Sequence, residues 1–426
     1  MKKIITTLLL STLYIFAGKL HTYSFISDDN CTLSYNLETE SKRIYPYGNT
    51  FEPMLGYSII KEHSRSGFET HVLSYMEACH SIHLTINLAL QQSIEQILDD
   101  RKLSLQADEI LVGVMDSKTG ELRALASSNR YAPLQKVDAN LTKIIQKFST
   151  FSYEPGSVMM PLVIASALER GYIEKETLIN VKGKLVYDNG KSVKDAIAND
   201  LLTAEGILLN MSNVGIGKIA YRFSGYEFKE SLERFGLYQY TKMITYYGNK
   251  GYIPPLELLT QSMYRGNASY GYGINATFLQ MLRAYSVFSN AGTLVEPRQI
   301  KALCRFAECF TVPVESVPDA LNPDVARAVH SMLVSNVKKG LAKKANVPAV
   351  VTGGMGSTAY RIKNGKYVHE YNSSFYGFAE DAKGNSYTIG VLVIKPKDPK
   401  QFYASRSAVP VFADVVKAMK AEGFLK

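Results

Sequence analysis

The sequence lacks the features that mark several specialised classes of protein. It has no internal repeat, no low-complexity tract and no run of basic residues with interleaved aromatics, so we expect no nucleic-acid partner. Cysteine is scarce, with 4 residues in 426, and no second pair of metal ligands lies near Cys304 and Cys309, which disfavours a metal site. The remaining composition, 46% hydrophobic and 20% charged, is ordinary for one large globular core with a small attachment.

The N-terminal apolar run is short as well. Lys2 and Lys3 precede an uncharged run from Ile4 to Gly18, which is shorter than the roughly 17 to 25 residues of a spanning helix. A charged start followed by an apolar segment is typical of an export signal. We therefore predict that residues 1–22 are a signal peptide or an uncleaved signal anchor. The formal charge of +9 suits an anionic membrane or wall polymer, and it equally suits a basic surface that meets only solvent.

The four cysteines fit an oxidising compartment. Cys304 and Cys309 lie between strand-like runs at 300–303 and 310–314, so we predict a hairpin closed by a disulfide. Cys31 and Cys79 could form a second bond. Four cysteines allow three pairings, and the sequence does not choose among them.

The stretch from Tyr153 to Ile173 contains the strongest chemical signal. Pro155 and Gly156 predict a turn, and Ser157 follows it at the start of an apolar helix. A serine in this place either caps the helix or projects into a cleft as a nucleophile. In enzymes that use such a helix-start serine as the nucleophile, a base sits one turn further on, and here that position holds Met160, which cannot accept a proton.

This stretch, YEPGSVMMP, resembles the YEPGSxxKP segment of class B penicillin-binding transpeptidases, in which the serine and lysine form the S-x-x-K motif. The resemblance runs from about Arg43 to the C-terminus and includes GYG at 271–273 and RAY at 283–285. It implies an α+β fold, an antiparallel sheet flanked by helices, over residues 86–426. Residues 23–85 would be the remnant of a non-catalytic N-terminal module.

The resemblance also implies where the chain works. It implies a bacterial cell envelope protein, either anchored in the inner membrane and facing the periplasm or periplasmic after signal cleavage. Peptidoglycan or envelope proteins would be its partners, and the chemistry would need no cofactor and no metal.

Two further motifs are carried over by the resemblance, and both are altered. The S-x-N motif falls on Met211, Ser212 and Asn213, so only the asparagine remains. The family's GKTGTA falls on residues 353–358, where Gly354 replaces the lysine and Met355 replaces the threonine. Gly356 is kept and Ser357 substitutes for the next threonine. The resemblance makes the main-chain N–H groups of Ser157 and Ser357 the donors to an oxyanion.

These replacements predict a degenerate transpeptidase that acts by binding. Two alternatives remain open: an active D,D-transpeptidase whose base comes from elsewhere, such as Lys182, Lys184 or Lys194, and a sensor of β-lactams or wall fragments that is acylated at Ser157. The same replacements bring methionines into or beside the cleft, where we expect them to make the groove apolar; they are Met159, Met160, Met211 and Met355.

Overall fold

The computed structural model describes residues 24–37, 42–56, 58–59, 64–65, 80–130, 147–242 and 248–426. The predicted signal segment, residues 1–22, lies outside these ranges, and so does Cys79 with its possible pairing to Cys31. Within the described ranges, no helix is both long and apolar enough to cross a membrane.

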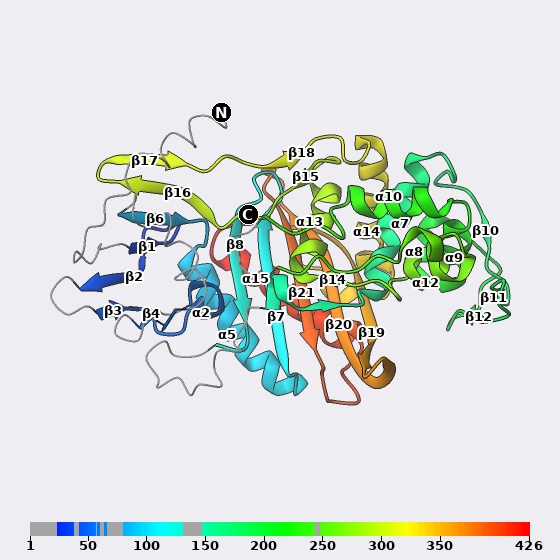
Figure 1. Cartoon of the computed structure of the whole chain (residues 1–426), viewed down its shortest axis with the longest axis horizontal. Coiled ribbons are helices and arrows are strands. Elements are labelled where there is room, and N and C mark those ends of the chain that lie inside the picture. The colour runs from blue at the N-terminus through cyan, green and yellow to red at the C-terminus, as the bar shows by residue number, and fades with distance from the viewer. Residues whose placement is uncertain are drawn as a thin grey trace.

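A five-stranded antiparallel sheet forms the centre of the molecule (Figure 1). Its strands come from both halves of the chain, in the order β19, β20, β21, β7, β8. Valine and isoleucine fill the middle of the sheet, and side chains on both of its faces are buried, because helices cover both sides. The bounds are β7 Glu109–Asp116, β8 Leu122–Ser127, β19 Val351–Lys363, β20 Lys366–Glu380 and β21 Ser386–Ile394.

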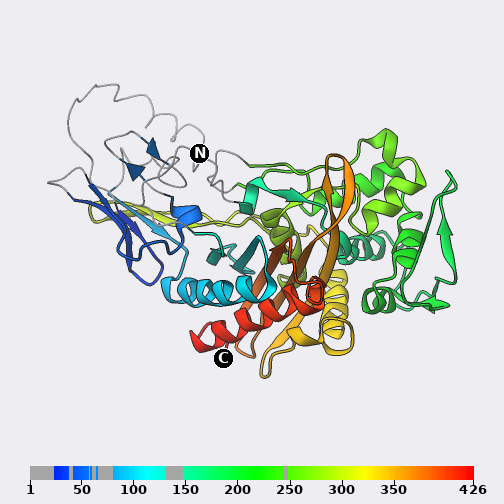
Figure 2. The ribbon, with the colours of Figure 1, turned by 90° about the horizontal axis from the view of Figure 1, so that it is seen from below.

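Helices on the two faces of the sheet enclose separate cores. α5 (Leu88–Leu105) and α15 (Ala408–Ala421) lie side by side on one face (Figure 2). α13 (Phe278–Ser289) and α14 (Pro323–Lys339) pack against the other. The predicted α+β fold, an antiparallel sheet flanked by helices, is therefore confirmed.

Helices α7 to α12 form a lobe beside α14. α8 begins at Ala204, where the Thr203 side chain caps the helix by accepting from the Gly206 N–H. Leu201 and Leu202, just before it, form a short strand. The lobe contains α7 Met160–Glu169, α8 Ala204–Asn210, α9 Asn213–Ala220, α10 Gly225–Arg234, α11 Leu256–Leu259 and α12 Ser262–Ser269. Its strand pairs are β10 Ile179–Asn180 with β13 Leu201–Leu202, and β11 Lys184–Val186 with β12 Ser192–Lys194.

A second sheet of six strands draws on two distant parts of the sequence. Its order is β17, β16, β6, β1, β2, β3. A hairpin from the second half of the chain thus completes the sheet formed by the first residues described. The bounds are β1 Ser24–Ile26, β2 Thr32–Leu37, β3 Lys42–Ile44, β6 Ser81–Leu84, β16 Ile300–Arg305 and β17 Glu308–Thr311.

The hairpin of β16 and β17 carries the disulfide. Cys304 and Cys309 face one another across the two strands, are bonded, and have Cα atoms 4.0 Å apart. Arg305 also pairs with Glu308, so Phe306 and Ala307 alone form the turn, and Phe306 takes a left-handed conformation at φ 53°. The predicted Cys304–Cys309 disulfide is present in the structure.

Short elements complete the fold between these layers. β9 pairs with β14 next to the turn that carries Ser157, and β15 pairs with β18. Their bounds, with those of the other short elements, are α2 Glu52–Leu55, β4 Ser58–Ile59, β5 Ser64–Arg65, α6 Lys147–Thr150, β9 Ser152–Tyr153, β14 Ala276–Thr277, β15 Leu294–Val295 and β18 Ser316–Val317.

Candidate functional site

Ser157 lies in a single 3-10 turn, Gly156–Met159, that runs directly into α7. Gly156 opens the turn at φ 66°, a conformation that favours glycine. The Ser157 side chain is half-buried, and its hydroxyl has no hydrogen-bond partner among the described residues. α7 begins at Met160 with no side-chain cap. The interpretation of Ser157 as a helix N-cap is therefore wrong, because its hydroxyl bonds to no backbone N–H.

Two segments matched in the sequence, the loop at Gly271 and helix α13, hold this turn in place. The Gly156 N–H donates to the Gly271 carbonyl at 3.1 Å, and the buried Tyr285 hydroxyl donates to the Val158 carbonyl at 2.7 Å. A Cβ on Gly271 would lie 2.2 Å from the Gly156 carbonyl oxygen, so only glycine fits there. The GYG and RAY passages thus position the Ser157 turn, a role that their spacing alone did not reveal.

The structure brings Ser157 and Ser357 together. The Ser157 N–H donates to the Ser357 Oγ at 3.0 Å, and a Cβ on Gly156 would lie 2.1 Å from that oxygen. Gly356, the next residue back along β19, faces the other side of the sheet, where Ala404 and Val409 lie. The N–H that the resemblance assigns to an oxyanion is therefore occupied by a side chain of the protein itself.

Gly354, where the resemblance places a lysine, has no room for a side chain. A Cβ there would lie 2.6 Å from the Phe375 ring and 2.7 Å from the Tyr376 carbonyl oxygen. On α14, the Asn336 side-chain amide donates to the Gly354 carbonyl at 2.9 Å and reaches the Met355 Sδ at 3.5 Å. A neutral amide and an aromatic ring thus occupy the surroundings of this position.

The second motif forms the link between α8 and α9. Met211 ends α8 in a left-handed conformation at φ 52° and is partly buried against the core. Ser212 is fully buried and caps α9: its hydroxyl donates to Asp195 at 2.5 Å and accepts from the Gly215 N–H. The Asn213 side chain is half-exposed and has no hydrogen-bond partner within the described part of the chain.

The methionines do not line an open groove. Met159, Met160 and Met355 are each 0% exposed and belong to the hydrophobic core. Only Met211 is partly exposed. The expectation of an apolar cleft lined by four methionines is wrong, because three of them fill space inside the protein.

The lysines considered as substitute bases lie elsewhere. Lys184 and Lys194 face one another across the exposed hairpin β11–β12 at the far edge of the helical lobe (Figure 1). Lys182 is exposed and lies 3.9 Å from Asp200. Among the described residues, none of these three lysines contacts Ser157.

Glu154, three residues before Ser157, is a buried carboxyl that sequence reasoning missed. Its Oε1 accepts from the Gly273 N–H at 2.7 Å and from the Tyr367 hydroxyl at 3.0 Å. Its Oε2 is buried and has no hydrogen-bond partner among the residues that the structure describes. Burial raises the pKa of the Glu154 carboxyl above its ordinary value of 4.5, and the two hydrogen bonds oppose part of that rise.

This raised pKa predicts a pH dependence of stability. A carboxyl whose folded-state pKa lies above its unfolded value stabilises the fold while protonated, and this contribution is lost as the pH rises through the folded-state pKa. We expect the melting temperature of Glu154→Gln, relative to wild type, to increase as the pH rises above 4.5. Melting curves of both proteins between about pH 4 and pH 8 measure this. A constant difference across that range would contradict the assignment.

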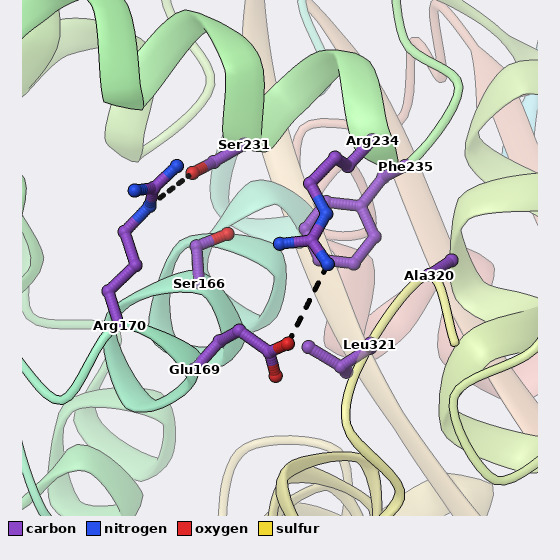
Figure 3. Close-up of a pocket in the computed structure, with 8 residues that line it drawn as sticks. All are labelled: Ser166, Glu169, Arg170, Ser231, Arg234, Phe235, Ala320 and Leu321. Atoms are coloured by element: carbon purple, nitrogen blue, oxygen red, sulfur yellow. Dashed lines mark hydrogen bonds and ion pairs between the residues drawn. The ribbon is translucent and has the colours of Figure 1, made fainter.

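The structure has two hollows away from Ser157, and neither is lined by a motif residue. The pocket in Figure 3 lies between α7 and α10, holds about 10 Å³, and has room for at most about one water molecule. Its charged groups are already engaged, since Arg234 lies 3.6 Å from Glu169 and Arg170 bonds to Ser231. A wider groove of about 670 Å³ lies along α14 and the start of α8, and its lining includes Asp324 and Arg327, which pair with one another.

Known proteins resemble this chain over most of its length. Penicillin-binding protein PbpB of Mycolicibacterium smegmatis is 29% identical over 79% of this chain and 53% of its own length. Peptidoglycan D,D-transpeptidase FtsI of Buchnera aphidicola is 26% identical over 91% of this chain and 71% of its own. The chain thus spans only part of each relative.

Solved structures show the same fold. Penicillin-binding protein 3 of Mycobacterium tuberculosis, in its apo form, superposes with a TM-score of 0.85 at 24% identity, over 95% of this chain and 97% of that one. The transpeptidase domain of Burkholderia pseudomallei penicillin-binding protein 3 gives a TM-score of 0.69 at 26% identity, over 80% and 96%.

The family match covers both the central sheet and the helical lobe. The penicillin-binding protein transpeptidase domain matches residues 110–417. This range includes the Ser157 turn, the α8–α9 link and β19. Since it is well over half of the chain, the protein belongs to the penicillin-binding protein transpeptidase family, among relatives of class B.

Proposed function

We propose that this chain is a penicillin-binding transpeptidase homologue that has lost efficient catalysis and acts by binding, in peptidoglycan synthesis or in an envelope complex. The observation that carries this is the state of Ser157. Its hydroxyl has no hydrogen-bonded base among the described residues, Met160 stands one turn on and is fully buried, and the Ser157 N–H already bonds to Ser357. We place the protein in the bacterial cell envelope, with inner-membrane anchoring through the N-terminal segment as part of the proposal.

A second candidate is a protein that is acylated at Ser157, as an enzyme or a sensor. The Ser157 hydroxyl and the Asn213 amide favour it, since both are partly exposed and neither has a hydrogen-bond partner in the part of the chain that the structure describes. Its weakness is the missing proton acceptor. A positioned base contributes roughly 10²- to 10⁴-fold to such a reaction.

Replacing the chromosomal gene by a Ser157→Ala allele tests the proposal. A protein that works through its surface does not need the hydroxyl, so we expect cell shape, growth and protein level to match wild type. A strain lacking the gene is the control that reveals the phenotype of complete loss. If Ser157→Ala reproduces that phenotype at normal protein level, the chain works through acylation.

A further inference from the structure

Three side chains of types that bind metal ions meet where the hairpin of β16 and β17 joins β6 (Figure 1). They are His83 on β6 and the bonded pair Cys304 and Cys309, and one ligand atom from each lies within 4.8 Å of the other two. No second pair of metal ligands lies near the cysteines in the sequence, which is why a metal site was disfavoured there. The structure supplies a third ligand from a strand far earlier in the chain.

The pairing of the three strands explains why these side chains face one another. Cys304 lies opposite Cys309 on β17, and His83 lies opposite Ala302. Alternate residues of a strand point to the same face of a sheet, so Ala302, Cys304 and their partners share one face. Diagonal neighbours across an antiparallel pair are about 7 to 8 Å apart, which an aromatic side chain can span. The Ser81 Oγ lies 3.4 Å from the His83 Nε2 and limits rotation of the ring.

The cluster is anchored in the sheet and open to solvent on one side. Cys304 is only 3% exposed, His83 is half-buried and Cys309 is exposed. An ion can therefore approach past Cys309, as a metal site requires. Lys301, a neighbouring cation on β16, already pairs with Asp28, which reduces its repulsion of a bound metal.

We propose that His83, Cys304 and Cys309 bind Zn²⁺ when the disulfide is reduced. Thiolate and imidazole are ligands that zinc prefers, and water can complete the tetrahedron. Zinc holds sulfur at about 2.3 Å and nitrogen at about 2.0 to 2.1 Å, so its donors lie roughly 3.5 to 4 Å from one another. Because the three ligand atoms already lie within 4.8 Å, side-chain rotation after the bond breaks is sufficient. The disulfide links only the two strands of the hairpin, whereas the ion would also link β6 to them.

The change from disulfide to zinc site needs a two-electron donor, which we take to be a dithiol. The two thiols of the donor become a disulfide, the Cys304–Cys309 bond breaks, and each cysteine sulfur gains one proton. Zn²⁺ then binds the two thiolates and the neutral imidazole, and both protons are released to solvent. Oxidation of the two cysteines expels the ion. Occupancy of the site therefore depends on the redox potential of the surroundings.

Absorption spectroscopy with Co²⁺ tests this proposal, because cobalt bound by thiolates absorbs strongly in the near ultraviolet and Zn²⁺ displaces it. The full chain carries Cys31→Ser and Cys79→Ser, so that Cys304 and Cys309 supply its only thiols. After reduction by a phosphine, and removal of the phosphine without oxygen, we expect one thiolate-bound Co²⁺ per chain. The oxidised parent should show no thiolate band.

His83→Ala should weaken Zn²⁺ binding, measured by competition with Co²⁺, by more than tenfold, since even the loss of an outer-shell partner costs about 10- to 100-fold. His80→Ala removes a nearby histidine, whose ring packs on Phe306, and should bind as the parent does. His83→Cys supplies a thiolate in place of the imidazole and should restore binding, which separates a lost ligand from a damaged strand.

Three results would each overturn the inference: a reduced parent without the thiolate band, an oxidised parent with the same band, or a His83→Ala protein that binds Zn²⁺ as tightly as the parent. A His83→Cys protein that binds no better than His83→Ala would overturn it too. None of these measurements involves Ser157, so the zinc site and the proposed lack of catalysis stand or fall separately.

Discussion

Wild-type protein incubated with a reporter penicillin should remain unlabelled under conditions that label a catalytic relative to completion. The Ser157 hydroxyl stays a neutral, weak nucleophile because Met160 cannot take its proton, and groups that act as one catalytic unit together account for about 10⁶ in rate. The loss of a cation at Gly354 also weakens attraction for the carboxylate of the drug, by roughly 1.5 to 3 kcal/mol. Labelling followed by gel fluorescence and intact mass measures the outcome.

Ser157→Ala sets the background for this measurement, and a catalytic relative with an intact lysine sets the upper limit. The bond from the Ser157 N–H to Ser357 adds a further obstacle, because an oxyanion would have to displace it. Rapid labelling of wild type that disappears in Ser157→Ala would overturn the pseudoenzyme proposal. That result would instead support a sensor or an enzyme that is acylated at Ser157.

Introducing lysine at both motif positions should lower the stability of the protein and should not restore acylation. Met160 is fully buried, so Met160→Lys places an amine in the core without a partner, at roughly 1 to 3 kcal/mol for the unsatisfied group alone. Gly354→Lys drives a Cβ to within 2.6 Å of the Phe375 ring. Overpacking of this kind costs about 1 to 3 kcal/mol. We expect the double variant to unfold at clearly lower urea concentration than wild type and to remain unlabelled by penicillin.

Two matched variants separate the cost of a buried amine at position 160 from the cost of overpacking at position 354. Met160→Leu conserves volume and polarity, so it should cost less than about 1.5 kcal/mol. Adding Phe375→Leu to Gly354→Lys removes the ring that a Cβ would strike, and it should recover part of the lost stability. A double-lysine protein as stable as wild type, or one that acylates readily, would show that these positions still accept the ancestral chemistry.

Much of the fold was predictable because the elements outside the motifs keep strong local signals. The strand-like runs at 300–303 and 310–314 lie within β16 and β17 or overlap them, and the apolar helix expected after Ser157 is α7. The pairing of β16 with β6, more than 200 residues earlier, has no such local signal.

The site was predicted less completely, because its properties depend on contacts between distant residues. The resemblance placed Ser157 and Ser357 at one site, but the sequence could not show that the Ser357 hydroxyl would occupy the Ser157 N–H, or that Phe375 would fill the space beside Gly354. Nor could it tell a methionine in the core from one in a cleft, since both follow the same helical pattern. Glu154 stood within the matched segment, yet only burial revealed its unpaired oxygen.

The six-stranded sheet also sets an order of events during synthesis. β6 pairs with β1 on one side and with β16 on the other. The second edge of β6 therefore stays uncovered until the chain has been synthesised as far as residue 300. At about 5 to 20 residues per second, that interval is roughly 10 to 40 seconds. An uncovered strand edge is a template for association with other chains. A fragment that ends before β16 would therefore present this edge of β6 to other chains, whereas in the full-length protein the hairpin closed by Cys304–Cys309 covers it.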